Sequence, residues 1–222
     1  MKKQNNDGFF SNLFFDIIRI VISPPGFLFF RVKVLYENKA ARKKIRGGAI
    51  LASNHLSYVD PVYLMYAFWY RRIHFVTLKE LFNTKAKKFW FTKFKCIPID
   101  RENFNMSSFK EIVRNLKANH MVGIFPEGRI LTDKNISVQD FKSGMVLMAL
   151  QSGKPIVQAC IRKKKHWWDR IVIAVSEPVD VMKLCGLNAN LNDIDSITKK
   201  LHDKEEELCK LVESYRKRKV RK

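Results

Sequence analysis

Two residues with the types and spacing of a catalytic pair follow a short apolar run near the start of the chain. His55 follows the apolar run of residues 49–52 after Ser53 and Asn54, and Asp60 lies five positions further on. In such a pair the carboxylate fixes the imidazole tautomer and stabilises the imidazolium, so the histidine acts as a general base near neutral pH. No serine of the protein is needed if a hydroxyl of the substrate is the nucleophile. We therefore take His55 and Asp60 as candidate catalytic residues, although a loop histidine and a helix start before Pro61 would use the same residue types.

The elements that would position these side chains alternate between strands and helices along the chain. Strands are expected at residues 49–52, 74–78, 121–125, 156–161 and 171–175. Helices are expected at residues 60–71, 85–94, 107–119, 141–153 and 196–222. This alternation predicts a single α/β domain with a mixed, mostly parallel sheet flanked by helices. His55, Arg101 and Glu127 each follow an apolar run, so they are expected to converge at the carboxyl ends of the strands, where ligands of such sheets bind.

Four motifs occur in a characteristic order between residues 54 and 158. They are Asn54-His55 with Asp60, Cys96-Ile97-Pro98-Ile99-Asp100-Arg101, Phe125-Pro126-Glu127-Gly128-Arg129, and Pro155-Ile156-Val157-Gln158. Together they resemble the glycerolipid acyltransferase family, whose nearest members are the bacterial 1-acyl-sn-glycerol-3-phosphate (lysophosphatidic acid) acyltransferases. The resemblance extends over residues 27–181. Arg129 follows Gly128 directly, where the family commonly has one residue between them, and the fourth motif is degenerate.

This resemblance implies an acyl transfer used in phospholipid biosynthesis. A thioester of acyl-carrier protein or coenzyme A would supply a fatty acyl chain to the free hydroxyl of 1-acylglycerol-3-phosphate, giving phosphatidic acid. Glycerol-3-phosphate or another lysolipid is the alternative acceptor. The attacking oxygen belongs to the acceptor, so no acyl-enzyme forms, and no cofactor is implied.

The resemblance also assigns roles to five residues beside the catalytic pair. Arg101 and Arg129 would bind the phosphate of the acceptor, and Gly128 would let the backbone approach it closely. Glu127 would hold the arginines or contact the glycerol. Asn54 would shape the turn between strand and loop beside His55. The donors for the oxyanion remain unassigned.

The charge of the chain predicts an anionic partner. Lys and Arg outnumber Asp and Glu by 42 to 21 among 222 residues, a formal net charge of +21. Nucleic acid, an acidic protein and an anionic membrane surface would each fit this charge. The acyltransferase resemblance favours the membrane and an acidic or phosphorylated acyl donor, so we expect no nucleic-acid partner.

The two ends of the chain favour a peripheral or monotopic position at the cytoplasmic face of the cell membrane. Residues 1–34 are rich in phenylalanine, and their longest uncharged run, Ile20 to Phe30, is too short to span a bilayer. They predict a membrane-interfacial helical hairpin, with a core helix as the alternative. Residues 35–185 would form the catalytic domain. Residues 186–222 would form a charged helix whose tail, Arg216–Lys222, contains six basic residues.

The cysteines indicate no metal site and no structural cross-link. Cys96, Cys160, Cys185 and Cys209 are widely spaced, and none lies near a histidine at the spacing of a metal site. We therefore expect four reduced thiols in a cytosolic setting.

Two other classes of function use residues in the same region. A hydrolase could use Ser53 or Ser57 as nucleophile beside His55, but the chain has no G-x-S-x-G motif. A non-catalytic basic module would use the alternating basic and aromatic residues of 85–94. Neither explains the motif at residues 125–129.

Overall fold

The computed structural model describes residues 17, 30–100, 106–130, 140–162, 166, 169–186 and 190–220, with side chains as far as Tyr215. The hairpin predicted in residues 1–34 lies outside this part of the chain except for Ile17 and residues 30–34, and Arg101 lies outside it altogether. Among the described residues, no helix combines the length and hydropathy that crossing a bilayer requires.

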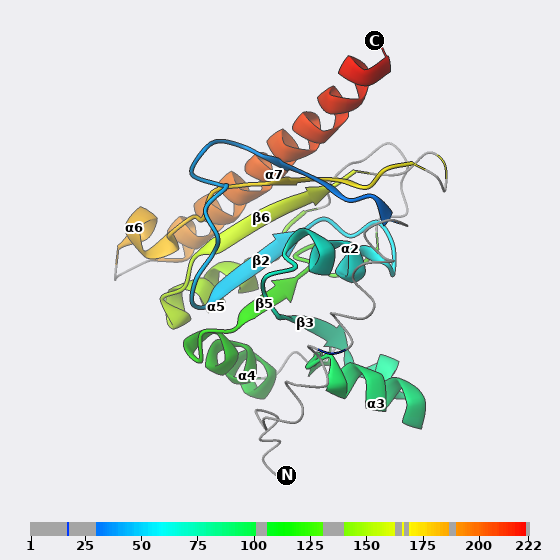
Figure 1. Cartoon of the computed structure of the whole chain (residues 1–222). Helices are drawn as coiled ribbons and strands as arrows, with labels where there is room; N and C mark the ends of the chain where they lie inside the picture. The colour runs from blue at the N-terminus through cyan, green and yellow to red at the C-terminus, as the bar shows by residue number, and fades with distance from the viewer. Residues whose placement is uncertain are drawn as a thin grey trace.

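A seven-stranded sheet forms the centre of the molecule (Figure 1). Its strands are β1 (Lys33–Tyr36), β2 (Ala49–Ser53), β3 (Ile73–Leu78), β4 (Ile97–Ile99), β5 (Met121–Ile124), β6 (Ile156–Ile161) and β7 (Val172–Val175). They lie in the order β1-β7-β6-β2-β5-β3-β4, and all neighbours are parallel except β6 and β7. The prediction of a mixed, mostly parallel sheet in an α/β domain is therefore confirmed.

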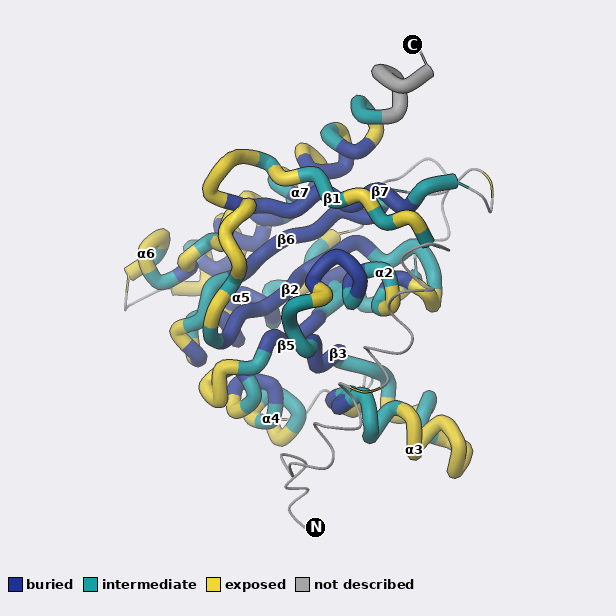
Figure 2. Tube along the Cα trace, viewed as in Figure 1, coloured by how far each residue is buried: buried dark blue, intermediate teal, exposed yellow. Residues whose placement is uncertain are grey.

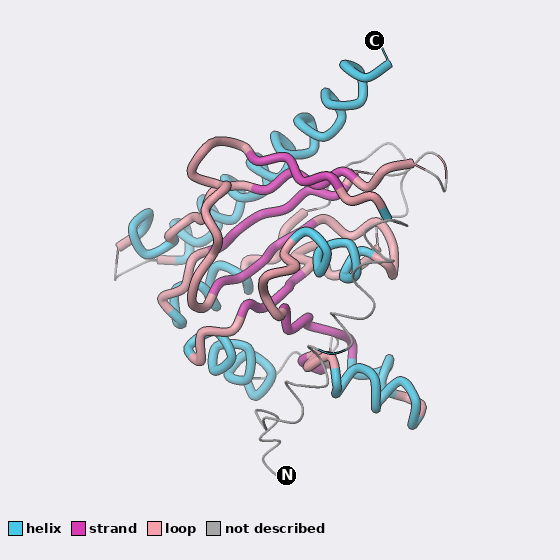
Figure 3. The backbone as a smooth tube through the Cα atoms, viewed as in Figure 1, coloured by secondary structure: helices cyan, strands magenta, loops and turns pink. Residues whose placement is uncertain are grey.

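Helices cover both faces of the sheet (Figure 3). They are α2 (Asp60–Ala67), α3 (Lys85–Lys93), α4 (Met106–Lys117), α5 (Gly144–Ser152), α6 (Val181–Cys185) and α7 (Leu191–Val220), with a 3₁₀ turn η1 (Lys79–Phe82) before α3. Apolar residues of α4, α5 and the first turns of α7 pack on one face, and those of α2 pack on the other. The domain boundaries at residues 34 and 185 remain predictions.

The central strand β2 shows why the apolar run before His55 forms a buried strand. Successive side chains of a strand point to opposite faces. Ile50 and Ala52 accordingly enter the core under α4 and α5, while Ala49 and Leu51 enter the core under α2. A strand between two parallel neighbours and covered on both faces needs a continuous apolar sequence, which is what this run supplies. Figure 2 shows β2 buried along its length.

Helix α7 lies across the sheet beside β6 and β7 and supplies a third part of the core (Figure 1). Its buried side chains recur at helical spacing: Ile194, Ile197, Thr198, Leu201, Glu205, Leu208, Cys209 and Val212. Most are apolar, as the buried stripe of an amphipathic helix should be. Glu205 is the charged exception.

The expectation of four reduced cysteines is wrong for two of them. Cys160 of β6 and Cys209 of α7 form a disulfide, with Cα atoms 5.4 Å apart. Their separation of 49 residues conceals this proximity in the sequence, because only the packing of α7 on β6 brings them together. Cys96 and Cys185 are free thiols.

Most predicted elements are present with shifted ends, and three short ones were not predicted. The helix expected from residue 141 begins at Gly144 and ends at Gly153, whose φ of 64° is the left-handed conformation that favours glycine at a helix end. Strands β1 and β4 and helix α6 have only three to five residues each. Segments this short carry too little periodicity to be distinguished from loops.

Candidate active site

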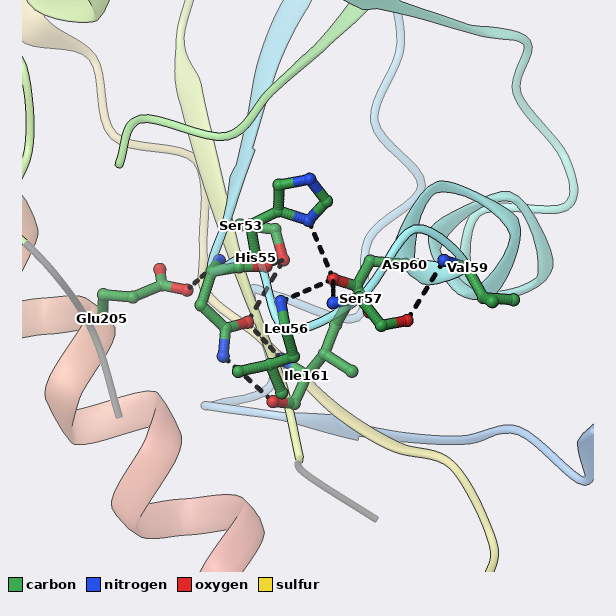
Figure 4. A network of polar contacts seen from close by, with 9 residues as sticks. Ser53, His55, Leu56, Ser57, Val59, Asp60, Ile161 and Glu205 are labelled. Carbon is green, nitrogen blue, oxygen red and sulfur yellow. Dashed lines mark hydrogen bonds and ion pairs between the residues drawn. The ribbon is translucent and has the colours of Figure 1, made fainter. Parts of the chain in front are cut away.

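The predicted catalytic pair is formed at the carboxyl end of β2. The Nδ1 atom of His55 lies 2.9 Å from Oδ2 of Asp60 (Figure 4). The Asp60 side chain is 2% exposed and the His55 side chain 17% exposed, so the acid is enclosed while the imidazole remains accessible. The pairing of His55 with Asp60 predicted from their spacing agrees with this geometry.

Asp60 is held by the loop that it closes. Its Oδ2 atom also accepts the backbone N–H groups of Leu56, at 2.6 Å, and Ser57, at 2.7 Å. Asp60 is the first residue of α2, where the partial positive charge of the helix favours a carboxylate. A carboxylate with these donors accepts the Nδ1–H of His55, which places the lone pair of the neutral imidazole on Nε2. In the described part of the chain, Nε2 makes no hydrogen bond, so it can accept a proton from a substrate.

A stack of aromatic rings fixes the plane of the imidazole. The His55 ring lies 4.0 Å from the ring of Phe125 at an interplanar angle of 15°, and Phe125 stacks in turn on Phe75, 6.1 Å away at 10°. Phe75 lies over Gly123 of β5, where a Cβ atom would come within 2.5 Å of the Phe75 ring. Gly123 therefore leaves the space that this stack requires.

The motif at residues 125–129 forms a tight turn directly after β5. Gly128 donates its backbone N–H to the carbonyl of Phe125 at 3.0 Å, and its φ of 72° is in the left-handed region that favours glycine. The turn buries Glu127, which is 4% exposed, and leaves Arg129 exposed. Glu127 and Arg129 thus point to different environments, one inside the domain and one at its surface.

Asn54 connects the end of β2 to the end of β6. Its Nδ2 donates to the carbonyl of Ile161 at 3.0 Å, and its Oδ1 accepts the N–H of Ile161 at 2.8 Å. The side chain thereby extends the ladder between β2 and β6 by one step. That Asn54 shapes the turn beside His55 stays a prediction.

The two serines offered as alternative nucleophiles have structural roles. Ser53 is fully buried and its hydroxyl donates to the carbonyl of Asn54 at 3.3 Å. The Ser57 hydroxyl accepts the N–H of Val59 at 3.1 Å at the start of α2. These positions speak against a serine hydrolase at this site.

A model of the acyltransferase family matches residues 31–162, more than half of the chain. The chain belongs to the acyltransferase family.

Two bacterial relatives and one solved structure are similar to this acyltransferase. The chain is 34% identical over 112 residues to a 1-acyl-sn-glycerol-3-phosphate acyltransferase of Bacillus subtilis, covering 50% of this chain and 54% of that protein. It is 32% identical over 101 residues to a protein of the same name from Streptococcus pneumoniae, covering 45% and 36%. The chain thus spans about half or less of the length of these relatives. The crystal structure of the 1-acyl-sn-glycerophosphate (LPA) acyltransferase PlsC from Thermotoga maritima has the same fold, with a TM-score of 0.64 at 18% identity, covering 90% of this chain and 80% of that one.

One residue beside the site of this acyltransferase was not predicted and lies outside the region that the family model matches. Glu205 of α7 is fully buried, and its carboxylate accepts the backbone N–H of Asn54 at 3.2 Å (Figure 4). Burial raises the pKa of Glu205 well above its usual value, and the nearby charge of Glu127 raises it further. The sequence does contain a signal for it, because an acidic residue occupies a position of the apolar stripe of α7, between Leu201 and Leu208.

Proposed function

We propose that the protein transfers a fatty acyl chain from a thioester to the free hydroxyl of 1-acylglycerol-3-phosphate and so produces phosphatidic acid for phospholipid synthesis. The single observation that carries this proposal is the pair of His55 with an enclosed Asp60, at the sheet edge beside the turn of Phe125–Gly128. The names of the relatives support the choice of acceptor.

In the proposed reaction His55 is the general base. Its Nε2 atom removes the proton of the acceptor hydroxyl while the oxygen attacks the thioester carbonyl. Collapse of the tetrahedral intermediate breaks the carbon–sulfur bond, and the thiolate leaves with the proton that His55 returns. The products are an ester and a free thiol, so atoms and charge balance without an acyl-enzyme. Asp60 holds the tautomer and stabilises the imidazolium that forms between the two proton transfers.

The acceptor phosphate would be bound by Arg129 and Arg101, with Gly128 allowing close approach of the backbone. The exposure of Arg129 directly after the turn supports this role, because a guanidinium at the surface can reach a headgroup presented by a membrane. The donor is an acyl thioester of acyl-carrier protein or coenzyme A. Both are anionic, and the net charge of +21 suits both.

We also propose that the protein binds the anionic surface of the membrane peripherally, at its cytoplasmic face, and that α3 contributes beside the two ends of the chain. No residue of α3 is buried, and its nine residues include four lysines and no acid. Phe89 and Trp90 are 49% and 46% exposed. Such a helix combines apolar contact with attraction to anionic lipid. It follows β3 and η1 at the carboxyl end of a strand parallel to β2, the same edge of the sheet as His55 (Figure 1).

The deciding experiment measures thiol release from acyl-carrier-protein and coenzyme A thioesters with purified protein. A panel of acceptors should include 1-acylglycerol-3-phosphate, glycerol-3-phosphate and a lysolipid without a terminal phosphate. The expected result is release that depends on 1-acylglycerol-3-phosphate, with phosphatidic acid identified by mass spectrometry. Release without any acceptor would indicate a hydrolase, and no release with any pair would contradict the proposal.

A further inference from the structure

The acidic residue on the buried stripe of α7 contacts the loop that carries His55 from inside the core. Glu205 is fully buried, although a carboxyl group is among the most costly side chains to enclose. It lies 43 residues beyond the end of the region that the family model matches, which is residue 162. A buried carboxyl of this kind is destabilising unless hydrogen bonds replace those that it made to water.

Both oxygens of Glu205 accept hydrogen bonds from residues of neighbouring strands. Oε1 accepts a hydrogen bond from the backbone N–H of Asn54 at 3.2 Å, and Oε2 accepts one from the Nε2–H of Gln158 at 3.1 Å. The same Nε2 also donates to the carbonyl of Leu201, one helical turn before Glu205. The carboxyl therefore joins α7 to the residue that follows β2 and to the middle of β6.

The contact with Asn54 falls at the last backbone position before His55. The side chain of Asn54 is already fixed to both polar groups of the Ile161 backbone. Its N–H has no partner on a strand and takes Glu205 instead. With this bond Asn54 is held through its backbone by α7 and through its side chain by β6, immediately before His55.

We propose that Glu205 is a positioning residue of the acyl-transfer site, which fixes the backbone of Asn54 and thereby the orientation of His55 toward the acceptor hydroxyl. Glu205 acts through Asn54 and touches no reacting atom. The kinetic part of this proposal rests on the proposed function, whereas its structural part concerns the backbone and imidazole alone.

The surroundings of Glu205 determine which property of the carboxyl matters. Around it lie Asn54 from β2, Gln158 from β6, the disulfide of Cys160 and Cys209, and the charge of Glu127 from the turn after β5. The two cysteines are joined and carry no charge. Among the described residues, the groups that donate hydrogen bonds to Glu205 are neutral amides. We infer that the site uses the acceptor oxygens of Glu205 rather than a negative charge.

Two substitutions separate the acceptor from the charge. Glu205→Gln keeps an acceptor oxygen without a charge, and Glu205→Met keeps a similar volume with neither. In Glu205→Met, kcat should fall about 10- to 100-fold, since small misplacements of a catalytic group have effects of this size. The KM values for donor and acceptor should change less, because neither substrate touches Glu205. Glu205→Gln should retain kcat within about threefold, since its acceptor is retained.

The matched control is Glu206→Met, which removes a carboxyl from the exposed face of the same helix. It should leave kcat unchanged. Should Glu205→Met fail to fold, Glu205→Asp replaces it, since this change retracts the carboxyl by one methylene, and the same loss of kcat is expected. Wild-type kcat in a folded Glu205→Met or Glu205→Asp protein would overturn the proposal.

A second readout does not require activity. Hydrogen exchange of the Asn54 amide and the imidazole resonances of His55 can be followed by NMR in the wild type and in the same variants. Exchange at Asn54 should be at least about tenfold faster in Glu205→Met than in Glu205→Gln, because only the latter retains a partner for this N–H. If the wild type transfers no acyl group, the proposed function fails while this test still applies. Equal exchange and unchanged His55 resonances in all variants would overturn the positioning role.

Discussion

Two segments that follow parallel strands at the same edge of the sheet, β2 and β3 on either side of β5, are built in opposite ways. In the loop after β2 the polar groups are hydrogen-bonded within the protein. Asp60 accepts hydrogen bonds from two backbone N–H groups and from Nδ1 of His55, and the side chain of Asn54 is hydrogen-bonded to the backbone of Ile161. The segment after β3, η1 with α3, has no buried residue and presents lysines and aromatic rings. Figure 2 shows the contrast between a buried β2 and an exposed α3.

Under the proposed function, the loop after β2 orients the catalytic base, and α3 attaches the protein to the membrane. A general base needs a fixed tautomer and direction, which only buried and fully bonded neighbours provide. A surface that meets a bilayer needs area and charge but no single geometry. Changes in the loop after β2 should therefore affect kcat, and changes in α3 should affect binding to vesicles.

Removing the base should have the largest effect. In His55→Ala, kcat is expected to fall about 10³-fold, within the range that a general base contributes. Asp60→Asn should lower kcat about 10²-fold, because it disturbs the tautomer but leaves the imidazole. Steady-state kinetics with a thioester donor measure both, and His166→Ala, at an exposed position, is the control. Activity of folded His55→Ala within tenfold of wild type would contradict the mechanism.

Reduction of the disulfide between β6 and α7 should lower the stability of the fold that supports the site. A cross-link between residues 49 apart stabilises a fold by about 4 kcal/mol on the chain-entropy argument, so a dithiol reductant should lower the free energy of unfolding by up to that amount. The double variant Cys160→Ala, Cys209→Ala should be destabilised similarly and insensitive to reductant, while Cys185→Ala should respond as the wild type does. Denaturant titration measures these changes. Alkylation of four thiols in unreduced, unfolded protein would exclude the disulfide.

The error over these cysteines shows what the sequence can predict. Local features were predictable: the apolar run of β2 indicated a strand, and the spacing of His55 and Asp60 indicated their pairing. Partners contributed by distant segments were not. The acid in the apolar stripe of α7 indicates that Glu205 is buried, but it does not indicate Asn54 as its partner, and nothing local indicates the disulfide. Both depend on how α7 packs against β6, which no short stretch of sequence encodes.

The contribution of α3 to membrane binding should be measurable by vesicle flotation. Lys87→Ala with Lys88→Ala should weaken binding to anionic vesicles about 30-fold at low salt, since each basic residue near the surface contributes about 1 kcal/mol. Phe89→Ala with Trp90→Ala should weaken binding at high salt, where charge is screened and apolar burial remains.

The control for these variants lies on α4, whose last turn precedes the opposite end of β5 (Figure 1). Lys110→Ala with Lys117→Ala removes two exposed lysines there and should change flotation little. Equal losses from α3 and α4 would indicate a diffuse charge effect and no defined surface.

Deleting residues 1–30 should leave only salt-sensitive binding to vesicles, and unchanged flotation at high salt would exclude that segment as an anchor.

Substitution of Arg129 should have a smaller effect than substitution of His55, and it should change the KM for the acceptor rather than kcat. Arg129→Ala is expected to raise the KM for the acceptor about tenfold, the value of one charge-assisted contact, with little change in donor KM. Arg101→Ala should behave alike. The control acceptor is a lysolipid without a terminal phosphate, whose KM should not respond. A rise in donor KM with an unchanged acceptor KM would assign both arginines to the thioester donor instead.

The smallest effect concerns the pH dependence of stability, to which Glu205 contributes with a sign opposite to that of a salt-bridged acid. Burial raises the pKa of Glu205 in the folded state, so the folded state holds this proton more tightly than the unfolded state does. The stability of the wild type should therefore fall as pH rises from the ordinary pKa of a glutamate, about 4.3, toward the raised pKa. Glu205→Gln removes this titration, so the variant should gain stability relative to the wild type across that window.

Urea titrations at intervals between about pH 4 and pH 8 measure the difference, with Glu206→Gln as the exposed control. A constant difference across this range would show that Glu205 remains in one protonation state throughout, whereas a gain in Glu206→Gln as well would assign the slope to net charge.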